Sequence, residues 1–111
     1  MTVLGVIRGT NMIVYEVTAT VRQELRAEFE SYMRTAHVRD LLDTGHFKGA
    51  EMAISDGGVY KIRYWAEDRE ALEDYFGSEG ERLREDFLNH FPDGIEISRE
   101  VLKLIDSWNW R

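Results

Sequence analysis

The residues best suited to chemistry are one histidine, His37, and the three tyrosines Tyr15, Tyr60 and Tyr64. An imidazole has a reference pKa of about 6.5, so it can exchange a proton at neutral pH, and phenols donate and accept hydrogen bonds. Between a sheet and its helices, such groups would line a cleft suited to a small aromatic or polyketide-like molecule. His37 is therefore the candidate catalytic residue, and the tyrosines are candidate ligand contacts.

A structural role competes with each of these functional roles. A histidine near a helix end often caps the helix or makes a structural hydrogen bond, and strands are rich in aromatic residues whether or not they bind a ligand. A fully packed interface between helices and sheet would favour the structural interpretation. A cavity walled by Tyr15, His37, Tyr60 and Tyr64 would favour the functional one.

Other chemical signatures are missing from the sequence. The chain has no cysteine, and His37, His46 and His90 lack the i, i+4 spacing of a helical zinc motif, so no metal site is expected. There is no phosphate-cradling glycine loop, no dinucleotide fingerprint and no G-x-S-x-G elbow. The sequence therefore predicts neither a metal nor another cofactor.

Composition restricts the partners and the compartment. The 111 residues include 21 acidic and 14 basic side chains, for a formal net charge of -7, which disfavours nucleic acid and anionic membrane surfaces. No apolar run approaches the ~20 residues of a membrane-spanning helix, and the short run near the N-terminus is shorter than a signal-peptide core. A cytoplasmic protein without nucleic-acid or membrane partners is expected, in keeping with the lack of cysteine.

The elements that must position these residues follow a simple order. Alternating apolar positions predict strands over residues 12–20, 46–55, 59–67 and 95–105, with Asp56-Gly57-Gly58 as a hairpin turn. Helical stripes separate them, one running through Leu25, Phe29 and Met33 and the other from Asp68 through Leu72, Phe76, Gly80, Leu83 and Phe87. Gly80 indicates either a close approach of this helix to the sheet or a break at residues 77–80.

This order predicts an α+β fold, a ferredoxin-like β-α-β-β-α-β arrangement with a four-stranded antiparallel sheet and two helices on one face. The domain is expected to span residues 12–105. Residues 1–11 would form an N-terminal extension that fits no element, and Met12 is an alternative start. Residues 106–111 would form an aromatic tail, whose Trp108 and Trp110 could close a cleft, clasp a partner or pack on their own domain.

The sheet face away from the helices is expected to carry a mixture of apolar and charged side chains. The residues assigned to it are Val14, Glu16, Phe47, Glu51, Arg63, Trp65 and Arg99. Monomers usually avoid exposing an apolar patch of this size, and a charge buried on it would need an opposite charge. A homodimer formed through this face is therefore predicted.

Five segments in order, MIVYEVTATV, HVRDLLDTGHF, VYKIRYWAE, LREDFLNHF and SREVLKL, resemble an uncharacterised bacterial family, domain of unknown function 4286. The resemblance spans Met12 to about Leu104. Families of this shape are similar to the dimeric α+β barrel superfamily, in which two ferredoxin-like sheets face each other. That similarity implies a homodimer and, by analogy, cofactor-independent oxygenase, isomerase or cyclase chemistry. The alternative is a non-catalytic homodimer with an interaction or regulatory role.

Overall fold

Four antiparallel strands form the main sheet, in the order β3-β4-β2-β5. In the computed structural model, which describes residues 3–7 and 11–110 and the side chains of residues 11–108, they are β2 (Ile13–Val21), β3 (Phe47–Ile54), β4 (Val59–Ala66) and β5 (Ile95–Lys103). Each pair of neighbouring strands is antiparallel. Strand β2 is therefore central, between β4 and β5.

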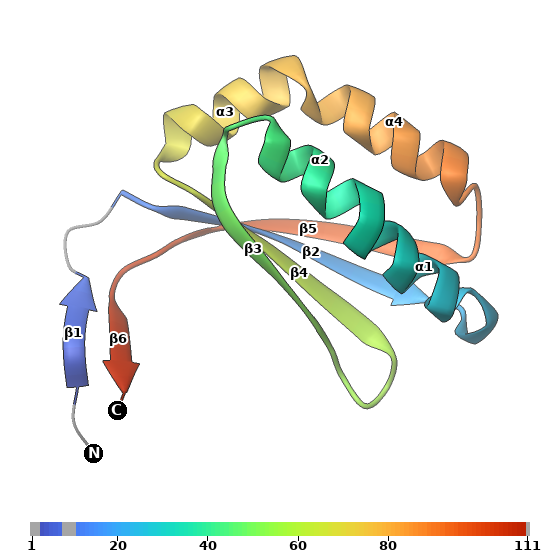
Figure 1. Cartoon of the computed structure of the whole chain (residues 1–111), viewed down its shortest axis with the longest axis horizontal. Coiled ribbons are helices and arrows are strands. Elements are labelled where there is room, and N and C mark those ends of the chain that lie inside the picture. Colours follow the sequence, from blue (N-terminus) through green and yellow to red (C-terminus); the bar gives the residue numbers. More distant parts are fainter. Residues whose placement is uncertain (1–2, 8–10, 111) are drawn as a thin grey trace.

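The helices cover one face of this sheet (Figure 1). A 3-10 turn (Gln23–Leu25) leads into α1 (Arg26–Tyr32), a π-helical segment (Met33–His37) and α2 (Val38–Asp43), and after β4 come α3 (Arg69–Ser78) and α4 (Gly80–His90). The predicted α+β class and β-α-β-β-α-β order are confirmed. Among the described residues, no helix is both long enough and apolar enough to cross a bilayer.

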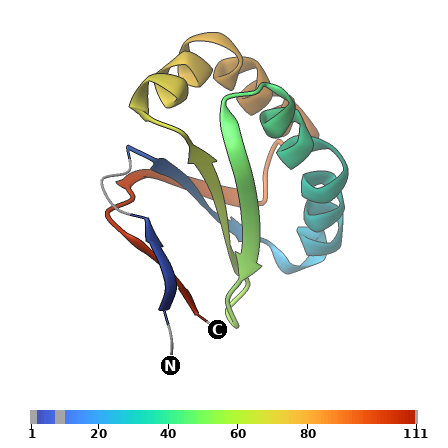
Figure 2. The same cartoon turned by 60° about the vertical axis from the view of Figure 1, so that its left-hand side comes forward.

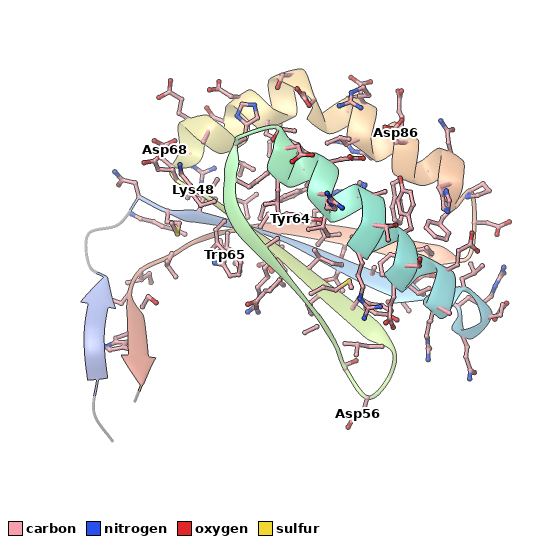
Figure 3. The ribbon with its side chains drawn as sticks, in the orientation of Figure 1. Lys48, Asp56, Tyr64, Trp65, Asp68 and Asp86 are labelled. Carbon is pink, nitrogen blue, oxygen red and sulfur yellow. The ribbon has the colours of Figure 1, made fainter. Side chains whose placement is uncertain are left out.

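Strand β4 shows why the sheet has one buried face. Tyr60, Ile62 and Tyr64 are buried beneath the helices, whereas the intervening Lys61 and Arg63 are exposed on the other face. This alternation follows from the two-residue period of a strand. Figure 3 shows Tyr64 between the sheet and the helices, and Trp65, the next residue, on the opposite side of the sheet.

A β-bulge near the start of β3 reverses the predicted orientation of Phe47. Phe47 pairs with Ala66 and Gly49 pairs with Trp65, so Lys48 is an extra residue on this strand. Phe47 is consequently buried among the core side chains, with its ring centroid 4.9 Å from that of Tyr75. Its assignment to the open face of the sheet was wrong, because simple alternation from Glu51 does not hold across the bulge.

The second helical region is broken at Gly80. Asp68 caps α3 as its sequence context suggests, accepting a hydrogen bond from the Ala71 amide at 2.8 Å. Helix α3 ends at Ser78 and α4 begins at Gly80, so the alternative of a break is the one realised. A Cβ added to Gly80 would lie 3.1 Å from Tyr75 Cε2, so the glycine also permits close packing of these two helices.

A second, two-stranded sheet joins the two ends of the chain. Strand β1 (Val3–Ile7) pairs antiparallel with β6 (Ser107–Trp110). Figure 2 shows this small sheet set off from the main body, on the side away from the helices. The sequence predicted neither strand, because each is short and its partner lies at the opposite end of the chain. The side chain of Trp110 lies outside the described residues.

The packing of α4 can be tested with two identical substitutions in one helix. Leu83 has 0% of its surface exposed and Leu88 has 51%. Leu83→Ala is expected to lower the free energy of unfolding by about 2–5 kcal/mol, because it leaves a cavity at the interface of helix and sheet. Urea denaturation measures the loss. Leu88→Ala is the matched control, with an expected change within about 0.5 kcal/mol; equal losses in both variants would contradict this packing.

Candidate functional site

A cavity of about 40 Å³ lies between the helices and the sheet. Strands β2, β4 and β5 form its floor, and α1, the π-helical segment, α2, α3 and α4 form its walls. Its apolar lining consists of Val17, Ala19, Phe29, Met33, Leu41, Ile62, Phe87 and Ile97, together with Gly80. Its polar lining consists of Tyr15, His37, Tyr64, Tyr75, Arg84 and Arg99.

The π-helical segment is what allows the first helical arm to line this cavity along its whole length. Phe29, Met33, His37 and Leu41 all reach the cavity at four-residue intervals. In an ideal α-helix each four-residue step advances about 40° around the axis, so three steps would turn Leu41 roughly 120° away from Phe29. The wider π-helical turn at residues 33–37 offsets part of this drift. In the sequence, the π-helical turn is indicated by the regular four-residue spacing of Phe29, Met33, His37 and Leu41.

His37 is partly buried, and its buried Nδ1 atom is unsatisfied. Among the described residues, no group donates to or accepts from its Nδ1 atom. Burial lowers the pKa of His37 to about 4, because the charged form loses its hydration; Asp40 and Asp86 oppose this shift and Arg99 adds to it. His37 is therefore neutral at pH 7. Proton exchange at that pH requires a ligand whose charge raises this pKa.

Three tyrosines surround the polar part of the cavity. The ring centroid of Tyr15 lies 5.9 Å from that of Tyr64 and 6.4 Å from that of Tyr75. Burial raises the pKa of all three phenols, so they are protonated hydrogen-bond donors at neutral pH. The sequence did not single out Tyr75, because the predicted stripe ran through Phe76, which is 40% exposed.

Tyr60 lies outside the cavity lining, although the sequence grouped it with the other ligand contacts. Its ring packs on Phe29, with centroids 4.8 Å apart, and its hydroxyl donates a hydrogen bond to Glu30 on α1. Burial, reinforced by the neighbouring Glu30 carboxylate, raises the pKa of Tyr60 to about 12. Tyr60 therefore connects β4 to α1 and has a structural role.

Two arginines complete the polar lining, and the sequence interpretation missed both as cavity residues. Arg99 pairs across the strands with Val17, and both residues line the cavity. Its expected place on the open face beside Glu16 was therefore wrong, because the register of β5 sets Glu100, not Arg99, opposite Glu16. Arg84 is exposed on α4, one turn from both Gly80 and Phe87, and that spacing beside the buried stripe is the signal that could have identified it.

On the open face of the sheet, several charged side chains of β2, β3 and β4 are paired with one another. Arg63 Nε lies 2.6 Å from Glu16 Oε2, and Lys61 Nζ lies 3.6 Å from Glu16 Oε1. Arg63 also approaches Glu51, at 3.8 Å. The hydrogen bond from Arg63 is the main cause of a lowered Glu16 pKa. Glu16 is covered by these long neighbouring side chains, not by depth in the core, so it keeps its charge.

The other end of the open face is apolar. A groove of about 550 Å³ is bordered by the sheet residues Val14, Arg63, Trp65 and Leu102 and by residues 103–106 and Trp108 of the C-terminal segment. Ile105 and Trp108 are 76% and 51% exposed. Trp108 of β6 thus borders the main sheet of its own chain, while half of its surface remains exposed.

The sequence model of one protein family, described as domain of unknown function (DUF4286), matches residues 12–105. The chain belongs to the DUF4286 family. A comparison with curated proteins gives no significant match. Within the part of this DUF4286 chain that the structure describes, no group of three His, Asp or Glu side chains is arranged to hold a metal ion.

The partly buried His37 should make stability depend on pH. In the unfolded chain its pKa is about 6.5 and in the folded chain about 4, so between these values the unfolded state binds more protons. Stability should therefore fall as the pH is lowered through this window, by an amount on the order of 3 kcal/mol from this residue. Urea denaturation of wild type and His37→Gln across pH 4–7 measures the difference in slope.

The exposed His90 provides the control for this pH dependence. The slope due to His37 should persist in His90→Gln. If wild type and His37→Gln showed parallel pH profiles, the buried neutral state of His37 would be disproved.

Proposed function

We propose that this DUF4286 domain binds a small molecule in the cavity between its helices and its sheet. The observation that carries the proposal is the buried Nδ1 atom of His37, a residue of the cavity lining, which has no hydrogen-bond partner among the described residues. An unsatisfied buried polar atom costs about 1–3 kcal/mol, and a ligand that supplied the missing hydrogen bond would recover that cost. The π-helical segment that ends at His37 supports this, because such segments are frequent at functional sites.

The volume of the cavity limits the ligand. An apolar cavity that binds benzene measures about 150 Å³, nearly four times the 40 Å³ found here. An aromatic or polyketide-like ligand would therefore enter only if side chains such as Phe87 moved. We propose that a group of a few non-hydrogen atoms occupies the enclosed space and that any larger part of the ligand remains at its mouth.

Acid–base chemistry without a cofactor is the activity best supported by these groups. Neutral His37 can accept a proton, and the phenols of Tyr15, Tyr64 and Tyr75 can donate hydrogen bonds to an oxygen that gains negative charge. An isomerisation needs no more than this, because the proton taken by His37 is returned to another atom of the same molecule. The non-catalytic alternative would be favoured by a closed interface, and the cavity argues against that arrangement.

Ligand binding can be tested with a thermal-shift screen of small polar and acidic metabolites. Binding is expected to raise the melting temperature of the wild type, and His37→Leu should lose most of the shift because it removes the unsatisfied nitrogen while keeping an apolar side chain. His90→Leu, a change at an exposed position, should retain the shift. A cavity filled only by structural contacts would give no shift with any compound in either background.

We also propose that the domain forms a homodimer through the open face of its main sheet. The apolar groove supports this, since Val14, Trp65 and Leu102 border it and the exposed side chains of Ile105 and Trp108 lie beside it. Glu16, Lys61 and Arg63 on the same face are already paired with one another, whereas Glu100, opposite Glu16 on β5, has no ion pair among the described side chains and would take an opposite charge from the second copy. A second copy, related by a two-fold axis, would present the same mixture of apolar and paired charged groups.

Light scattering coupled to gel filtration tests this homodimer. Wild type at micromolar concentration is expected to show twice the mass of the chain, and Trp65→Asp should shift it toward the monomer because it places a charge in the apolar groove. Leu88→Asp is the matched control, since Leu88 is exposed on α4. A wild-type monomer at this concentration, or equal effects of the two substitutions, would refute the interface.

A further inference from the structure

We propose that the cavity selects a small carboxylic acid, whose anionic group is held by Arg84 and Arg99 and whose other end reaches His37. This inference deepens the proposed binding function and rests on it. It concerns the chemical class of the ligand, which the size of the cavity alone leaves open.

The distribution of charge is the first argument. The chain carries 21 acidic side chains against 14 basic ones, yet the cavity lining includes two arginines and no aspartate or glutamate. The charge of the cavity lining is therefore positive, although the net charge of the protein is negative. An anion would be attracted to this site and weakly repelled by most of the remaining surface.

The second argument is that these arginines lack acidic partners. Among the described side chains, residues 11–108, neither Arg84 nor Arg99 forms an ion pair, whereas Arg82 on the same helix lies 3.2 Å from Glu79 and 3.4 Å from Asp86. Helix α4 therefore directs one arginine to acidic neighbours and another toward the cavity. The guanidinium donors of Arg84 remain available to a ligand.

The positive charges also act on the other cavity groups. Arg99, through its charge and hydrogen bonding, and Arg84 both oppose the rise in pKa that burial imposes on Tyr15, and the two arginines act in the same direction on Tyr75. Arg99 further disfavours protonation of His37. A carboxylate at the arginines would offset this field and would make His37 easier to protonate, which couples anion binding to the basicity of the histidine.

The shape of the site favours a carboxylate over an inorganic anion. A guanidinium group presents a planar set of donors that matches the two oxygens of a carboxylate. Beside Arg99 lie the apolar side chains of Val17 and Ile97, which suit a short aliphatic chain better than a fully hydrated ion. The 40 Å³ of the cavity has room for a few non-hydrogen atoms, such as the carboxylate end of a short-chain acid, and the remaining carbons of the acid would lie at the cavity mouth.

Butyrate and its neutral isostere butyramide test the inference, by NMR titration of the full chain at constant ionic strength. Butyrate is expected to bind at least about 10-fold more tightly than butyramide, because only it forms charge-assisted hydrogen bonds. Arg99→Gln and Arg84→Gln should each weaken butyrate binding about 10-fold or more and leave butyramide binding little changed. Butyrate should also raise the pKa of His37 in wild type, and a purely structural role of the arginines would not produce this change.

Arg39→Gln is the matched control, because Arg39 is exposed on α2 and does not line the cavity. It should bind butyrate as the wild type does. Arg99→Lys, which keeps the charge without the planar donor set, should lie between wild type and Arg99→Gln. Far-UV circular dichroism of each variant establishes that it is folded.

The contrary outcomes separate this inference from the proposed function. Equal binding of butyrate and butyramide would overturn the selection of acids while leaving a small-molecule site in place. Inorganic phosphate binding as tightly as butyrate would overturn the selection of carboxylates. If neither compound bound and the wider screen gave no thermal shift, the binding function and this inference would both fall.

Discussion

The site depends on a single geometric constraint, which is that one side of the helical arm from Arg26 to Asp43 must face the sheet over its whole length. A regular α-helix cannot do this with a four-residue repeat, because the repeat and the helical period differ. The π-helical segment at residues 33–37 corrects the phase and brings His37 and Leu41 onto the same side as Phe29. The position of His37 is therefore a consequence of the helical geometry of this arm.

The two faces of the main sheet carry their charged side chains in different ways. On the open face, Glu16 is held by Arg63 and Lys61, so the acidic and basic groups satisfy each other. On the helix face, the two arginines of the cavity are exposed and form no ion pair among the described side chains, and His37 stays neutral. A network whose charges pair with one another favours a fixed structural surface, whereas cations without acidic partners and an unpartnered Nδ1 atom favour a site that a ligand completes.

Most of the fold could be predicted from hydrophobic periodicity, because each main strand and helix buries one face and turns the other outward. Strand β4 followed that pattern through all its residues, and its tyrosines and arginine lie on the expected faces. Phe47 and Arg99 were misplaced because periodicity defines a face only relative to a register. A bulge in one strand and the offset of another cannot be read from a single segment. The pairing of β1 with β6 was missed for a related reason, since it joins segments that are distant in the sequence.

The candidate site was predicted in part, and what was missed follows from the same limits. Tyr15, His37 and Tyr64 line one cavity because they belong to regular elements whose buried faces are easy to identify. Tyr60 shares that face with Tyr64 but lies four residues away along the strand, beneath α1, and there it hydrogen-bonds to Glu30 instead. Arg84 was hidden because a charged residue next to a buried stripe is usually solvated. Its role becomes visible only when the helices bring it and Arg99 to a space that contains no carboxylate, and that juxtaposition is a property of the tertiary structure alone.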